Sequence, residues 1–432
     1  MRTSSSSYLA PFLSLILLSS LACGPGDADP GASGAGDRAL NWEPREVFAV
    51  GGFDAPDWAT FGEIGDVGFD ADGNLYIFDD QVAEITVVSP TGEFLRKFGG
   101  RGDGPGEIGQ PLAMTVFPDG KVAISDLGKR GVALFDAQGE WLGNALLDMS
   151  REGLPGPDMM AHPDGGVVSA QALRLFMNES AESEPNLPEG PDTRPVFVYP
   201  TTEDGPEAFE LHGAWDPPEP PEEDATTMEG GGDGNRISLR MAALQAFDPG
   251  LHVAVLADGR VAVVDSTAYR VELFDLAGTQ VGEWTRALNP APVTDAIREM
   301  ERDRRLAELE GEGSGRIRLL GGGGDVSFDQ AQVQEAMRER VEQMSFYPEV
   351  PVIVGLAADR AGRLWVERSG EMPGEDGPVD LLSSEGVYLG SLPGGSLGIP
   401  EAFGPGGLVA VRETDEFDVA TIRILEVPAG GS

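Results

Sequence analysis

The stretch 69–79 reads FDADGNLYIFD, and its pattern recurs as FPDGKVAISD over 117–126 and as LADGRVAVVD over 256–265. In each copy an apolar run leads to an Asp-Gly pair and a second apolar run follows. An Asp stands six residues after the turn Gly, at Asp79, Asp126 and Asp265. Because Gly accepts positive φ, Asp-Gly between apolar runs predicts a tight hairpin. The three stretches therefore predict three copies of one β unit.

A second turn Gly follows the first after 19 residues in each copy, and each second Gly comes just after another apolar run. Weaker copies extend the series, so that the inner-turn glycines stand at 73, 120, 165, 259, 362 and 406. The simple spacings are 47, 45 and 44 residues, and two longer spacings contain insertions. A unit of this size with four short antiparallel strands is typical of one propeller blade. The count predicts six blades.

We therefore expect an all-β protein in which residues 41–432 form a six-bladed β-propeller with four-stranded antiparallel blades. A blade cannot bury both faces alone, so each blade must cover its neighbour. The last unit has three strands of its own, and the run 43–50 after the N-terminal segment is predicted to supply the fourth. The innermost strands are expected at 64–69, 112–117, 159–162, 253–256, 352–357 and 399–403.

The run from Phe98 to Ile108, FGGRGDGPGEI, together with the following Asp119-Gly120 hairpin, resembles the NHL repeat. The GxGPGE stretch is similar to that of six-bladed β-propeller lipoproteins of bacteria. The resemblance covers roughly residues 43–428 and is strongest in the first, second and fourth units. It implies the propeller fold. NHL propellers include RNA-binding, protein-binding and sensor modules and an amidating lyase, so the fold alone does not indicate the function.

The N-terminus predicts export. Residues 1–22 combine Arg2 with an apolar run that is too short and interrupted for a membrane span and that ends before Cys23. This resembles a bacterial lipoprotein signal, in which Cys23 becomes the lipidated first residue. An ordinary secretory signal with an incidental Cys is the alternative. Residues 23–40 are rich in Gly, Ala and Asp and predict a flexible tether. The expected location is the bacterial cell envelope, on a periplasmic or outer-membrane face.

The charge excludes several partners. The chain has 432 residues with 30 Lys and Arg against 73 Asp and Glu, a net charge of −43. Nucleic-acid affinity comes from phosphate neutralisation by basic residues, so nucleic acid is not expected as a partner. Contact with a membrane is expected only through the lipid anchor. A single Cys excludes an intramolecular disulfide and a Cys-based zinc site.

Two insertions are expected to interrupt the repeat. Residues 179–233 hold 16 Asp and Glu with one Arg, and they are interpreted mostly as an acidic low-complexity loop, with Ca²⁺ capture as the alternative. Residues 292–347, between the fourth and fifth blades, are predicted to be helical. An apolar stripe at spacings of 4, 4 and 3 is expected to pack on the propeller. Its members are Val333, Met337, Val341 and Met344.

No motif indicates a catalytic constellation. The G-x-S-x-G match at 394–398 has no His after it, and the G-x-G-x-x-G match at 104–109 opens no helix. The three histidines, His162, His212 and His252, form no metal-binding pair. We predict no catalytic and no metal residues. No cofactor is expected, and Ca²⁺ held by carboxylates near the axis stays open. The recurring Asp79, Asp126 and Asp265 are expected to accept backbone N–H bonds instead.

The sequence therefore favours a binding or interaction module over an enzyme. The predicted binding rim lies at one mouth of the ring, where loops join the blades. Its candidate residues are Arg101, Asp103, Glu107, Arg130 and Arg270. The expected partner is a protein, peptide or glycan. The alternative is a divalent-metal-dependent hydrolase or lyase of the lactonase or amidating-lyase type, and a structural part of a larger envelope assembly is a third hypothesis.

Overall fold

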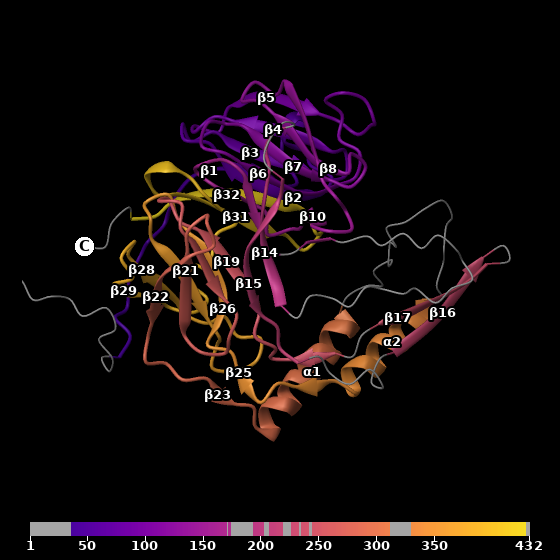
Figure 1. Cartoon of the computed structure of the whole chain (residues 1–432), viewed down its shortest axis with the longest axis vertical. Helices are drawn as coiled ribbons and strands as arrows, with labels where there is room; N and C mark the ends of the chain where they lie inside the picture. The colour runs from indigo at the N-terminus through magenta and orange to yellow at the C-terminus, as the bar shows by residue number, and fades with distance from the viewer. Residues whose placement is uncertain are drawn as a thin grey trace, which may run out of the picture.

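A computed structural model describes most of the chain as a ring of six four-stranded antiparallel blades (Figure 1). The described residues are 36–170, 172–173, 193–202, 207–218, 226–232, 235–241, 244–311 and 330–428. Cys23 and residues 1–35 lie outside this range. The six-bladed propeller predicted from the repeat is confirmed.

Blades are numbered here by the chain order of their innermost strands, and strands are given from inside to outside. Blade 1 is β2 (Ile64–Phe69), β3 (Leu75–Asp79), β4 (Glu84–Val88) and β5 (Phe94–Gly99); blade 2 is β6 (Pro111–Val116), β7 (Val122–Asp126), β8 (Gly131–Phe135) and β9 (Trp141–Leu146). Blade 3 is β11 (Met160–Ala161), β12 (Val167–Ser169), β14 (Thr193–Tyr199) and β15 (Phe209–Trp215); blade 4 is β19 (His252–Val255), β20 (Val261–Val264), β21 (Arg270–Phe274) and β22 (Gln280–Thr285). Blade 5 is β26 (Ile353–Ala358), β27 (Leu364–Arg368), β28 (Val379–Leu382) and β29 (Tyr388–Leu392); blade 6 is β30 (Ala402–Phe403), β31 (Leu408–Thr414), β32 (Ala420–Glu426) and β1 (Arg45–Gly51).

Blade 6 closes the ring with strands from both ends of the chain. Its outermost strand, β1, pairs antiparallel with β32 from Arg45 opposite Glu426 to Gly51 opposite Thr421. The remaining three strands are consecutive near the C-terminus. The prediction that the run 43–50 supplies the fourth strand of the last blade is confirmed.

The Asp-Gly turns between the first two strands of blades 1, 2 and 4 share one geometry. Gly73, Gly120 and Gly259 have φ of 84°, 81° and 87°. Each donates its N–H to the carbonyl three residues earlier, at distances of 3.3, 2.9 and 2.9 Å. A residue with a Cβ is strained at such φ values, which explains why Gly recurs in these turns.

The recurring Asp fixes the chain where it enters a blade. Asp126 is fully buried, and its carboxylate accepts the N–H groups of Gly109 at 2.7 Å and Gln110 at 2.8 Å, just before β6. It also accepts the N–H of Lys129 at 3.2 Å. Asp79 accepts the N–H groups of residues 62, 63 and 81 in the same way. The prediction that these aspartates accept backbone N–H groups is confirmed for Asp79 and Asp126, and Asp265 differs in accepting the N–H of Trp215 in the outermost strand of blade 3.

Packing between blades forms the core. Tyr76 and Phe78 of blade 1 lie in one buried cluster with Ile124 and Phe135 of blade 2. Similar clusters join the other neighbouring blades. Each blade therefore shields apolar surface of its neighbour from water, as expected for blades that cannot bury both of their faces alone.

An arm extends from the ring after blade 4 (Figure 1). It contains α1 (Asp295–Gly311) and α2 (Gln330–Glu342), which lie within the predicted helical insertion. A hairpin of β16 (Thr226–Gly232) and β17 (Asn235–Met241) lies beside α2. Neither helix is long and apolar enough to cross a membrane, and the same is true of every helix in the described residues.

The apolar stripe of α2 packs differently from the expectation. Val341 and Met344 are buried with Ala246 and with Leu306 and Leu309 of α1. The stripe therefore holds the two helices and the segment 244–247 together in a small core of its own, because the helices leave the ring and need each other to exclude water. Short strands secure the base of the arm, namely β18 (Gln245–Ala246) with β24 (Ser345–Phe346) and β23 (Ala291–Pro292) with β25 (Glu349–Val350).

Blade 3 includes part of the stretch 179–233, which the sequence predicts to be mostly an acidic insertion. Both β14 and β15 fall inside 179–233, so the described part of this stretch belongs partly to the propeller. Two further residue pairs, β10 (Leu154–Pro155) and β13 (Ala172–Leu173), form a small sheet next to this blade. The run 196–199 is recognisable as a strand in the sequence, whereas β15 is hidden by the acidic and Pro-rich segments that flank it.

We predict that Asp126→Ala lowers the free energy of unfolding by about 3 kcal/mol or more, because it leaves several N–H groups without their acceptor. Asp119→Ala is the matched control, since Asp119 is an exposed turn residue that accepts one N–H; its expected cost is under about 1 kcal/mol. Urea unfolding of both variants measures the difference. Equal midpoints for the two variants would show that the buried Asp is dispensable.

Candidate functional site

The two faces of the ring differ in the length of their connections. In an antiparallel blade, the first-to-second and third-to-fourth strand turns lie on one face, here called the lower face, and the other connections lie on the upper face. Lower-face turns are short, such as 70–74, 136–140 and 359–363. The longest connections, 170–192, 216–251 and 286–352, all start and end at the upper face. Departures from the repeat are thus concentrated on the upper face.

The upper-face loop 100–110 contains three of the predicted rim residues. Arg101 donates to the carbonyl oxygens of Asp80 at 2.7 Å and Gly109 at 3.2 Å, which ties both ends of the loop to blade 1. Glu107 accepts the N–H of Gly104 at 2.8 Å. Arg101 and Glu107 therefore shape this loop, whereas the side chain of Asp103 is exposed on it.

A turn of blade 2 joins this loop. Lys129 donates from Nζ to the carbonyl oxygen of Gly104 at 3.1 Å, and this contact places the turn 127–130 beside the loop 100–110. Arg130 is exposed and has a φ of 56°, a conformation that costs energy for a residue with a Cβ. The loop and the turn together hold three basic and two acidic residues, in a chain of net charge −43. This region, called here the blade 1–2 rim, presents basic side chains beside acidic ones, and the carboxylate of Asp126 lies between the loop and the turn.

Arg270 does not belong to the blade 1–2 rim. It begins β21 of blade 4, where its guanidinium lies 3.4 Å from Asp265 Oδ1 and 4.0 Å from Glu272 Oε1. The structure therefore brings Arg101, Asp103, Glu107 and Arg130 together and places the fifth predicted residue at a different blade.

The innermost strands offer few ionisable groups to the axis. In the sequences of the six described innermost strands, Asp66 and His252 are the only ionisable residues. Asp66 accepts the N–H of Met114 at 2.8 Å. Burial raises the pKa of Asp66 to about 6, and the neighbouring Asp80 and Glu401 add to the rise. Burial likewise lowers the pKa of His252 to about 4, so its imidazole is neutral near pH 7.

The three histidines lie in separate settings. The buried His162 makes a 2.7 Å hydrogen bond through Nε2 with the carbonyl of Gly259, joining the lower-face turns of blades 3 and 4. His212 lies in β15, which is a blade strand, although sequence analysis had placed it in the acidic insertion. Its possible ligand atoms and those of Asp265 and Glu272 lie within 4.8 Å of one another, the one such cluster in the part of the chain that the structure describes.

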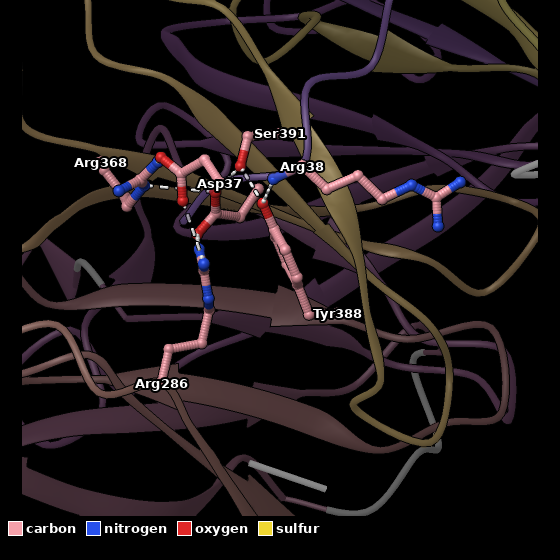
Figure 2. A network of polar contacts seen from close by, with 7 residues as sticks. Asp37, Arg38, Arg286, Arg368, Tyr388 and Ser391 are labelled. Carbon is pink, nitrogen blue, oxygen red and sulfur yellow. Dashed lines mark hydrogen bonds and ion pairs between the residues drawn. The ribbon is translucent and has the colours of Figure 1, made fainter. Parts of the chain in front are cut away.

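A polar network fixes the end of the N-terminal tether to the ring (Figure 2). Arg286, which follows β22, and Arg368, at the end of β27, both contact the carboxylates of Asp37 and Asp380. Asp380 is fully buried and also accepts a hydrogen bond from Ser391 Oγ at 2.6 Å. Burial opposes ionisation of Asp37, but hydrogen bonds from Arg368 and Arg286 outweigh it and hold its pKa below the usual range.

Backbone contacts extend this network, called here the tether clamp. Arg38 donates its N–H to the Tyr388 hydroxyl at 3.1 Å, and its carbonyl accepts the N–H of Ser391 at 2.8 Å. Leu40 then donates to the carbonyl of Ser391 at 2.8 Å, so residues 38–40 run along the outer edge of blade 5. The Arg286 guanidinium stacks 3.8 Å from the centre of the Tyr388 ring. The tether therefore leaves the propeller at a fixed place.

The spacing of the repeat could have identified one residue of the tether clamp, Arg368. Arg368 and Arg412 stand six residues after Gly362 and Gly406, at the positions where blades 1, 2 and 4 have Asp. Such a reversal of charge within a repeat marks a changed environment. No comparable signal identifies Asp37 or Arg286, because both lie outside the repeat.

Two small cavities lie on the lower face, away from the blade 1–2 rim. One, of about 210 Å³, is lined by the turns of blades 5 and 6, including Arg360, Arg363 and Pro405. The other, of about 310 Å³, lies between Asp258 and Ser384. Ligand pockets usually measure about 300–1,000 Å³, so both are at or below the small end of that range.

The sequence matches no protein-family model, and it matches no curated protein. Solved propellers are similar in fold. They include an exported protein of Bacteroides fragilis, with 11% identity, a TM-score of 0.44 and coverage of 90% of this chain and 95% of that one. A DUF4221 family member from Bacteroides vulgatus shares 11% identity with a TM-score of 0.43, covering 90% and 98%. Virginiamycin B lyase from Staphylococcus aureus, solved with quinupristin, shares 11% identity with a TM-score of 0.36, covering 89% and 98%. These similarities concern the fold alone.

We predict that Asp66→Asn stabilises the protein at high pH. The pKa of Asp66 is about 6 in the folded state against an ordinary value of 3.8, so the folded state binds more protons than the unfolded state between these values. Stability contributed by this group therefore falls as pH rises from about 4 to about 6. The amide that replaces the carboxylate keeps an acceptor for the N–H of Met114 and carries no charge.

Because Asp66 is partly exposed, we expect a gain of about 1–2 kcal/mol for D66N at pH 8 that disappears near pH 4. Thermal or urea unfolding across this pH range measures it, with Asp119→Asn as the exposed control. A gain that is the same at both pH values would contradict the assignment.

Proposed function

We propose that this protein is a lipid-anchored, extracytoplasmic propeller that binds a protein, peptide or glycan through its upper face. The observation that carries the proposal is the asymmetry of the connections. Lower-face turns repeat one short geometry, whereas the upper face holds the long connections and the blade 1–2 rim. Binding residues are concentrated on loops that a rigid scaffold positions.

The chemistry of the blade 1–2 rim favours a ligand with an anionic group. Arg130 is exposed there beside Lys129. Charges farther apart than about 8 Å are largely screened at physiological ionic strength, so these cations act locally despite the acidity of the whole chain. Asp103, which is also exposed, offers an acceptor next to them. A carboxylate-bearing peptide or glycan that also has hydroxyl or amide donors would use both.

The alternative, a metal-dependent hydrolase or lyase working at the axis, has less support. Such an enzyme needs several carboxylate, amide or imidazole groups converging on one ion. The described innermost strands contribute a single carboxylate, Asp66, and it accepts a backbone hydrogen bond from Met114. The acidic and imidazole side chains that do converge come from β15, from the position after β20 and from β21, none of which is an innermost strand.

The tether clamp gives lipid anchoring a structural consequence. The composition of residues 23–37 predicts an average span of roughly 20 Å between Cys23 and Asp37, from about 5–6 Å times the square root of the residue number. The docked tether end lies along β29, at the left in Figure 1, whereas the arm of α1 and α2 extends to the lower right. Anchoring through Cys23 would thus hold the edge of blade 5 near the membrane and leave the arm free.

We predict that Cys23→Ser releases the protein from the membrane. The substitution removes the thiol that lipidation requires and leaves the propeller unchanged. Fractionation of cells, together with incorporation of labelled palmitate, measures the effect against the unsubstituted chain. The variant should carry no label and appear in the soluble fraction. Label retained by C23S, or none on the unsubstituted protein, would refute lipidation at this residue.

Binding through the upper face predicts a pattern of crosslinks. A photoreactive phenylalanine analogue in place of Asp103 or Arg130 should yield adducts in intact cells after irradiation. The same analogue in place of Asp119 or Gln138, which are exposed on lower-face turns of the same blade, should yield few or none. Mass spectrometry of the adducts identifies the partner. Equal labelling from both faces, or none from the upper face, would argue against the proposal.

A further inference from the structure

We propose that His212, Asp265 and Glu272 form a binding site for a divalent transition-metal ion such as Zn²⁺, in the interface between blades 3 and 4. Their possible ligand atoms lie within 4.8 Å of one another. The three residues come from β15, from the position after β20 and from β21, so the site would join the outermost strand of one blade to the two middle strands of the next. This inference is independent of the proposed binding role of the blade 1–2 rim.

Each of the three side chains is oriented by a neighbour outside the set. Asp265 accepts the N–H of Trp215 at 2.8 Å through Oδ2. Glu272 accepts a hydrogen bond from Gln280 Nε2 at 3.3 Å. The His212 ring stacks on Phe274, with ring centres 4.1 Å apart and an interplanar angle of 28°. Such supporting contacts hold metal ligands in place and lower the entropy that binding must overcome.

The donor set selects the class of ion. Ca²⁺ and Mg²⁺ take oxygen ligands almost exclusively, whereas an imidazole nitrogen with two carboxylates suits Zn²⁺ and its neighbours in the first transition row. Three protein ligands leave one position of a tetrahedral ion open. The ion would therefore be able to accept one donor atom from a ligand or from water.

Arg270 neutralises the carboxylates while no metal is bound. Its Nη2 lies 3.4 Å from Asp265 Oδ1, and its Nη1 lies 4.0 Å from Glu272 Oε1. The Arg270 side chain is 40% exposed, so it can turn toward solvent when an ion arrives. Metal and guanidinium thus compete for the same two carboxylates. The competition distinguishes a metal site from an ordinary salt bridge, because removal of Arg270 should then increase the affinity for the metal.

Titration of the chelator-stripped, full-length protein with Zn²⁺ in competition with a chromophoric chelator tests the site. The unsubstituted protein should bind one ion tightly, above a background of weak binding by its many surface carboxylates. His212→Gln should weaken the tight site at least 100-fold, and Glu272→Gln at least tenfold. Arg270→Gln should tighten it about tenfold. Two matched controls, Arg130→Gln on another upper-face turn and His252→Gln near the axis, should leave it unchanged.

Titration with Co²⁺ adds a readout that does not depend on affinity alone, because a visible d–d spectrum reports ligand geometry. The spectrum should appear in the unsubstituted protein and in R270Q, and it should be absent from H212Q. Should H212Q fail to fold, E272Q and R270Q still decide the question by their opposite effects. Absence of a tight ion in the unsubstituted protein, or retention of it in a folded H212Q, would show that only surface carboxylates bind the metal and would overturn the proposal.

Discussion

Closure of the ring by β1 and β32 is the pairing on which the rest of the structure depends. Every blade covers the apolar face of the next, so the core is complete only when blade 6 is held between blades 5 and 1. The chain achieves this by pairing its first strand, β1, with its last strand, β32. Because the docked segment 37–40 precedes β1 by only a few residues, tension on the tether would be carried by the tether clamp before it reached the closing sheet.

Two charged residues of opposite sign secure the point where the chain leaves the closing blade and enters blade 1. Asp79 accepts the N–H groups of Gly62 and Glu63. Arg412 of blade 6 donates to the carbonyl oxygens of Ile64 at 2.6 Å and Gly65 at 2.9 Å. In the segment that enters blade 1, two N–H groups and two carbonyl groups therefore have hydrogen-bond partners. The same repeat position bears Asp or Arg according to which backbone groups face it.

The sequence was sufficient for the architecture because the repeat is local. The turn glycines, the two apolar runs and the following Asp lie within a few residues of each other, and their geometry recurs in the structure of Gly73, Gly120 and Gly259. Sequence reasoning also placed four of the five rim residues in one region, since the loop 100–110 and the turn 127–130 are short connections on the same face. Arg270 also follows an upper-face turn, but that turn belongs to blade 4, so rotation around the ring separates it from the other four.

Contacts between blades could not be predicted from the sequence, because they join residues that are distant in the chain. His212 and Asp265 meet because β15 lies against the next blade, and nothing near either residue in the chain reports that contact. The acidic, Pro-rich surroundings of β15 also disguised it as a loop. Asp37 and Asp380 share their two arginines through the same kind of long-range packing.

The acidity of the chain is compatible with the anionic ligand proposed for the blade 1–2 rim. A net charge of −43 repels polyanions such as nucleic acid, because many of their charges lie close to the surface at once. A ligand with one anionic group meets mainly the charges within about 8 Å at physiological salt, and at the blade 1–2 rim these include Lys129 and Arg130. Added salt would weaken this local attraction, while it would also reduce the general repulsion. Under the function proposed above, the acidic surface would thus admit small anionic groups and repel extended polyanions.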